Sequence, residues 1–104
     1  MTTTATAAFF EELEQRGYEP SLQTVSGTVR FDIMGEGSWW VTVNRSAITV
    51  ARTGTRADCI VAIAGQDFVP LVHRELNPLT AALQGRVKFT GDAALALVSL
   101  RSFA

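Results

Sequence analysis

The residues of this sequence that could do chemistry are few and scattered. The one histidine, His73, stands between Val72 and Arg74 on the polar side of a predicted helix, where a solvated imidazole is expected. A metal site needs three or four ligands, and the sequence has no second histidine and no Cys-x-x-Cys pair. A Ser–His–Asp triad would have to use His73, but no Gly-x-Ser-x-Gly elbow is present. We therefore predict no metal site, no cofactor and no catalytic residue.

The other reactive side chains have structural interpretations. Cys59, the only cysteine, begins the apolar run 59–64, where a reduced thiol packs as a small hydrophobic group. The glutamates between residues 11 and 14 fit the solvated face of a helix. Asp67 and Asp92 precede helical patterns, which is typical of N-caps. Nothing in their spacing favours a pair of catalytic acids.

Composition and charge limit the classes of function. Nine basic and ten acidic residues give a net charge of −1, and no basic stretch supplies the positive field that nucleic-acid binding needs. No apolar run approaches the ~20 residues that cross a bilayer, so stable membrane insertion is not expected. Residues 1–8 are uncharged and too weakly apolar for a signal peptide. We expect a cytoplasmic protein, and its 104 residues fit one domain, 1–104.

The elements that position these residues begin with a helix and several strands. Phe9 and Leu13 stand one turn apart in a helix expected over residues 7–16, and Gly17 is its expected left-handed end. Alternation of apolar and polar residues then predicts strands around residues 28–33, 39–44 and 48–50. The run 59–64 is apolar on both faces, which predicts a central strand covered on two sides. Short turns between these strands predict an antiparallel meander.

The chain then changes to a helical period. Asp67 is the expected N-cap of a helix with Pro70 in its first turn, and Asn77 is the expected cap of a helix that begins at Pro78. One apolar side is expected on each of these two helices. The first side holds Phe68, Val72 and Leu76, and the second holds Leu79, Ala82 and Leu83.

A short strand and a last helix complete the order. Val87 and Phe89 alternate with polar residues, and Asp92 is the expected cap of a helix over residues 93–103. The whole pattern predicts an α+β fold, with a mostly antiparallel five-stranded sheet and helices on one face.

The last helix carries more apolar surface than one packing face needs. At about 100° per residue, one apolar face is centred near Leu100. Leu95 and Val98 form a second ridge, roughly on the opposite side. The helix could therefore be covered twice, by another helix, a dimer partner or a ligand in a cavity, although ordinary core packing also fits. The strand face that carries Trp40 could be covered in the same ways. So could the leucines at positions 76, 79 and 83.

Several motifs between residues 57 and 97 resemble those of one known family. They are ADCI at residues 57–60, QDFVPLV at 66–72, Asn-Pro at 77–78 with Ala81, and QGRVKFTGDAALAL at 84–97. The string from Asn77 to Leu97 combines two helix caps with a basic strand at fixed spacing, which makes it more specific than any of its elements alone. From about Val25 to Leu100 the sequence resembles the sterol carrier protein-2 family. It lacks the glycine often found before the Asn-Pro pair in that family.

The resemblance implies a five-stranded sheet and helices that enclose an apolar cavity or tunnel for fatty acyl chains, sterols or similar lipids. It implies binding or transfer of lipid and no catalysis. The candidate lipid-binding residues are Trp40, Phe68, Val72, Leu76, Leu79, Leu83, Phe89, Leu95 and Val98. The alternative function is an interaction or accessory domain, whose apolar surface would contact a second copy of the chain or a partner enzyme.

Overall fold

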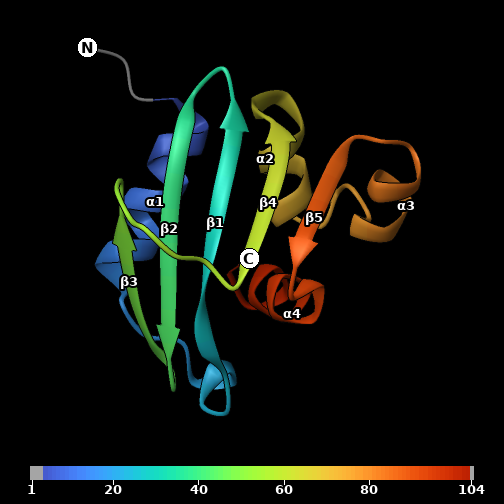
Figure 1. Ribbon diagram of the computed structural model, residues 1–104. Coiled ribbons are helices and arrows are strands. Elements are labelled where there is room, and N and C mark those ends of the chain that lie inside the picture. The colour runs from blue at the N-terminus through green and yellow to red at the C-terminus, as the bar shows by residue number, and fades with distance from the viewer. Residues whose placement is uncertain (1–3, 104) are drawn as a thin grey trace.

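The computed structural model describes residues 4–103. Residues 1–3 lie outside the described residues. They belong to the segment 1–8, in which no signal peptide is expected. The elements follow the predicted order of a helix, four strands, two helices, a strand and a helix (Figure 1). They are α1 (Ala5–Arg16), a 3₁₀ turn (Pro20–Leu22), β1 (Ser26–Met34), β2 (Gly37–Asn44), β3 (Ala47–Ala51), β4 (Cys59–Ala64), α2 (Gly65–Val72), α3 (Pro78–Leu83), β5 (Val87–Gly91) and α4 (Ala93–Phe103).

The five strands form one mixed sheet in the order β3-β2-β1-β4-β5. The pairs β1–β2, β2–β3 and β4–β5 are antiparallel, as expected, whereas β4 lies parallel to β1 with Cys59 opposite Val29. The predicted meander therefore ends at β3. The connection 52–58 then crosses the sheet, which places the apolar β4 between β1 and β5 and leaves β3 at the edge (Figure 1).

The helices pack on one face of this sheet, as predicted. Contacts join α1 to β3, α2 to β1 and β4, and α4 to β1, β4 and β5. Alternate strand residues on this face are fully buried, including Val29, Phe31 and Val61. Six aromatic side chains occupy the space between the helices and the sheet: Phe9, Phe10, Phe31, Trp39, Phe68 and Phe103.

The opposite face of the sheet carries Trp40 and the crossing segment. Trp40 is half-buried, and the guanidinium carbon of Arg30 lies 5.1 Å from its ring centroid. Gly54 of the crossing segment lies so close that a Cβ there would stand 2.6 Å from Trp40 Cδ1. Ile60 of β4 is only half-buried on this face, so the predicted cover on two sides of β4 is partial.

Local capping explains most of the helix boundaries. The α1 helix begins two residues earlier than predicted because the Thr4 hydroxyl accepts a hydrogen bond from the Ala7 N–H. Gly17 ends α1 at a left-handed φ of 58°, as expected. The Asn77 side chain caps α3, and Asp92 accepts from the Leu95 N–H at the start of α4, so both predicted caps are confirmed.

The predicted cap at Asp67 is wrong. The α2 helix already begins at Gly65, which places Asp67 inside its first turn. There the Asp67 carboxylate accepts a hydrogen bond of 2.7 Å from the Arg86 guanidinium, which joins α2 to the start of β5. An acidic group in the first helical turn also interacts favourably with the positive end of the helix dipole.

The buried face of α4 differs from the predicted one. Leu95, Ala96, Ser99, Leu100 and Phe103 are buried, whereas Leu97 and Val98 are half-buried. Leu95 therefore belongs to the main packing face and does not form a separate ridge with Val98. The small buried Ser99 occupies the centre of this face, and a pattern based on apolar residues alone does not reveal it.

Candidate functional site

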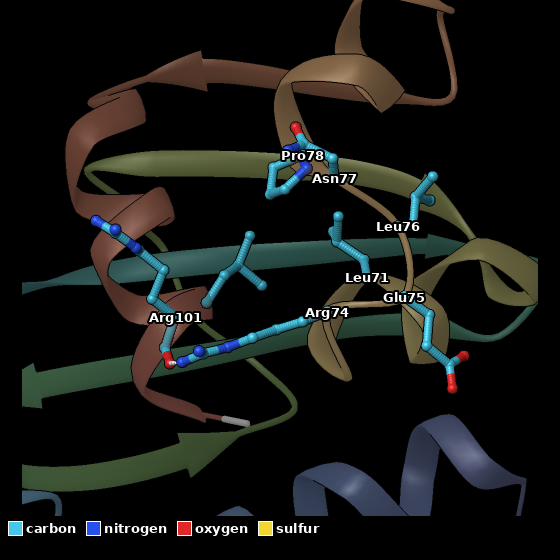
Figure 2. Close-up of a pocket in the computed structure, with 8 residues that line it drawn as sticks. Leu71, Arg74, Glu75, Leu76, Asn77, Pro78 and Arg101 are labelled. Atoms are coloured by element: carbon cyan, nitrogen blue, oxygen red, sulfur yellow. Dashed lines mark hydrogen bonds between the residues drawn. The ribbon is translucent and has the colours of Figure 1, made fainter.

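A cleft of about 380 Å³ lies between the end of α2, the connection to α3 and the last turns of α4 (Figure 2). Its lining residues are Leu71, Arg74, Glu75, Leu76, Asn77, Pro78, Leu100 and Arg101. Leu71 and Leu100 are each only 3% exposed, so the core fixes these two walls in place. Leu76 is partly buried against the same core. The cleft thus combines aliphatic walls with charged groups.

The turn after α2 shapes one side of this cleft. The amide N–H groups of Glu75 and Leu76 both donate to the Pro70 carbonyl oxygen, at 2.9 and 3.1 Å. Arg74 takes a left-handed φ of 63°, which is uncommon for a residue with a Cβ. Asn77 then caps α3 and Pro78 occupies its first helical position. These backbone constraints place Leu76 and Pro78 in the lining of the cleft.

Arg74 and Arg101 carry the positive charge of the cleft. The Arg74 guanidinium donates to the Arg101 carbonyl oxygen, which lies in the last turn of α4 (Figure 2). A cationic side chain is favourable beside the free carbonyl groups at a helix C-terminus. Both arginines also line a neighbouring, more open hollow of about 500 Å³, which includes Val98 and Ser102. Both hollows therefore offer guanidinium groups to a polar ligand group.

The structure brings few of the predicted lipid-binding residues together. Leu76 lines the cleft and Val98 lines the neighbouring hollow. Phe68, Val72 and Leu95 are buried in the core. These three side chains pack against other parts of the chain, so the structure gives them a role in the core. Their contact with lipid stays a prediction.

The remaining predicted residues lie elsewhere. Phe89 is partly buried against the core, and Trp40 lies on the sheet face opposite the helices. Leu79 and Leu83 are 65% and 90% exposed, so the predicted buried side of α3 is wrong. Ala81 is the buried residue of this short helix, because α3 packs beside β5 through that side (Figure 1).

Sequence reasoning named only Leu76 among the eight lining residues and missed the other seven: Leu71, Arg74, Glu75, Asn77, Pro78, Leu100 and Arg101. Leu100 was already the centre of a predicted apolar face, which identifies it as buried but not as a neighbour of Leu71. The arginines stand 27 positions apart, and only the fold brings them together. No local signal in the sequence indicates that pairing.

The reactive side chains lie apart from this cleft. Cys59 is buried in β4, as predicted, and burial raises the pKa of its thiol. His73 is exposed, also as predicted. The hydrogen bond from Arg86 to Asp67 raises the pKa of that guanidinium. Within residues 4–103, no three His, Cys, Asp or Glu side chains are grouped as metal ligands would be.

Comparison with known families fits both the fold and the sequence motifs. The profile of the SCP-2 sterol transfer family matches residues 9–99, most of the chain. The chain belongs to this family. Human sterol carrier protein 2 is 30% identical to it over 93 residues, which are 84% of this chain and 17% of the human protein. The SCP-2 chain described here thus spans less than a fifth of that relative.

Solved structures share the fold of this SCP-2 chain. The sec-alkylsulfatase Pisa1 from a Pseudomonas species matches 95% of it with a TM-score of 0.80 and 20% identity, using 16% of the sulfatase chain. Sterol carrier protein 2 from Yarrowia lipolytica, in its apo form, covers all of it with a TM-score of 0.75 and 15% identity, using 94% of that chain. At these identities the likeness shows the fold alone.

Between Thr4 and Phe103, no helix combines the length and the apolar character that crossing a bilayer requires.

Proposed function

We propose that residues 1–104 form a single SCP-2 domain that binds a lipid, a fatty acyl chain or a sterol, in the cleft of Figure 2 and does not catalyse a reaction. The observation that carries this proposal is the combination of a preformed leucine-walled cleft with guanidinium groups in its lining. Its volume of about 380 Å³ falls within the usual range for ligand pockets. The cytoplasmic location stays a prediction from the sequence.

The aliphatic walls supply the affinity in this proposal. Leu71 and Leu100 belong to the core, so they need little reordering when a ligand arrives. Each methylene group that leaves water contributes about 0.8 kcal/mol, from which the entropic cost of association is subtracted. A tail of about ten methylenes is therefore enough for useful affinity. The enclosed tunnel implied by the family is not required, and it too stays a prediction.

The charged groups orient the ligand in this proposal. A carboxylate or hydroxyl at the end of the ligand would meet Arg74 or Arg101, while the tail would lie between the leucines. Charge-assisted hydrogen bonds from a guanidinium are stronger than neutral ones, so an acid is expected to bind more tightly than its methyl ester. The Glu75 carboxylate, which also lines the cleft, would repel a ligand that carries more than one negative charge.

Native mass spectrometry and titration with cis-parinaric acid, a fluorescent fatty acid, test this function. We expect a co-purified lipid or a saturable signal that unlabelled fatty acid or sterol displaces. Leu76→Gln should weaken the affinity several-fold, because Leu76 lines the cleft. Val69→Gln is the matched control, since Val69 is also partly buried against the core but is not part of that lining. An unsaturable titration would contradict the proposal.

A second candidate function is supported by the exposed leucines of α3 and by the length of the relatives. The human relative is several times longer than the matched region, so this domain occurs there beside other parts of a chain. An interaction domain would use Leu79 and Leu83 to contact a second copy or a partner enzyme. Sedimentation of the purified protein distinguishes a homodimer from a monomeric lipid binder.

A further inference from the structure

The α3 helix exposes two leucines that its own fold does not cover. Leu83 is 90% exposed and Leu79 is 65% exposed. The two residues are four positions apart, so they lie on the same side of the helix. Ala81 faces the rest of the molecule and is fully buried, which fixes the leucines on the outer side. Exposed leucines side by side on a helix indicate a surface that something else covers.

This apolar patch adjoins the proposed lipid site. Pro78, the first residue of α3, is part of the cleft lining, and so is Leu76, two residues before it (Figure 2). Leu79 and Leu83 themselves are not part of that lining. The leucines therefore lie next to the cleft without filling it.

The surroundings of the patch are basic, although the whole chain has a net charge of −1. Residues 74–88 include Arg74, Arg86 and Lys88 but only one acidic residue, Glu75. Arg101 joins Arg74 across the cleft. Arg86 is partly neutralised by its ion pair with Asp67. This charge balance complements an anionic lipid surface, whereas two copies that met through this patch would bring like charges together.

We propose that the α3 leucine patch, Leu79 and Leu83, inserts shallowly into the surface of anionic membranes and so places the adjoining cleft where lipid enters or leaves. This proposal rests on the proposed function. Leucines on one side of a surface helix, with basic residues around them, are the features by which peripheral helices lie in the headgroup region. Contact of this kind is reversible, as transfer requires.

A second copy of the chain fits the patch less well. The six residues of α3 span only about 9 Å. A stable protein–protein interface needs about 800 Å² and 20–30 residues from each partner. Two leucines on so short a helix supply a small part of that area, whereas a lipid surface accepts a small apolar insertion.

The direct test is co-sedimentation with phosphatidylcholine–phosphatidylserine vesicles. Leu79→Ser/Leu83→Ser should weaken vesicle binding at least about tenfold. Met34→Ser is the matched control, because Met34 is 64% exposed on the opposite face of the sheet and should leave vesicle binding unchanged. Replacing phosphatidylserine by phosphatidylcholine should weaken binding by about fivefold for each basic residue that contacts the surface. Equal binding by the double variant and the wild type would overturn the proposal.

A second measurement separates this proposal from the lipid-binding function. We expect the double variant to keep the equilibrium affinity for cis-parinaric acid but to transfer it to vesicles more slowly. If the wild-type protein binds vesicles through these leucines but does not bind the fatty acid, the lipid-binding function is refuted and the membrane-binding role of the leucine patch stands. A wild-type dimer that the double variant converts to monomer in sedimentation would overturn the membrane surface, because the partner would then be a second copy.

Discussion

Leu95 of α4 lies directly against Gly27 of β1: a Cβ on Gly27 would stand 2.7 Å from Leu95 Cδ2. A Cβ at this position would require Leu95 to shift, and the Gly27 φ of 155° is also unfavourable for other residues. The contact fixes the rotation of α4 on the sheet, because it points Leu95 inward. Leu100, whose side chain forms a wall of the proposed lipid site, is held in place by the same docking.

Leu95→Ala should therefore lower the free energy of unfolding by about 2–5 kcal/mol, the usual range for removing a buried leucine side chain. Urea denaturation followed by tryptophan fluorescence measures this change. Val98→Ala is the control, because Val98 is half-buried beside a solvent-open hollow and should cost less than about 1 kcal/mol. Equal costs for the two variants would show that α4 is rotated differently from the structure described here.

Asn77→Ala should lower the free energy of unfolding by about 0.5–2 kcal/mol. The Asn77 side chain accepts hydrogen bonds from the N–H groups of Leu79 and Thr80, at 2.9 and 3.2 Å, and alanine leaves both donors without that partner. Asn77→Asp keeps the acceptor oxygen and should restore most of the stability. Although Asn77 also lines the cleft, we expect the affinity for cis-parinaric acid to change little well below the melting temperature. A large loss of affinity at unchanged stability would instead identify Asn77 as a ligand contact.

The stability of the protein should fall at alkaline pH because of Cys59. Burial raises the pKa of this thiol in the folded state above its unfolded value of about 8.5. The folded protein then retains a proton that the unfolded chain loses. The thiol's contribution to stability is therefore complete below the unfolded pKa and is lost as the pH rises through the folded pKa, with a slope of at most about 1.4 kcal/mol per pH unit.

Urea denaturation from pH 7 upward measures this slope, and Cys59→Ala is the control. The alanine variant is expected to start from a lower stability, because it removes a buried side chain, but to lose less per pH unit. The two proteins differ only at position 59, so the difference between the two slopes belongs to Cys59. Identical slopes would show that the thiol is not protected from ionisation in the folded state.

The sequence by itself determined the features that depend on neighbouring residues. Asn77 and Asp92 cap their helices because a side-chain oxygen reaches N–H groups two or three residues ahead. Gly17 ends α1 because a residue without a Cβ accepts a left-handed φ. Strand alternation correctly identified buried positions such as Phe31 and Val41. The order of these local patterns predicted the α+β class, and the family motifs agree with it.

Only the tertiary structure decided which elements meet. The parallel pairing of β4 with β1 follows from a crossing segment whose path no local pattern encodes. Leu79 and Leu83 fit an apolar helical side, yet they are exposed because α3 lies beyond β5 with no element over it. The cleft likewise joins Arg74 to Arg101 across 27 positions. Hydrophobic periodicity reports that a face prefers burial, but the partner that covers it depends on long-range packing, in which many faces compete for the same core.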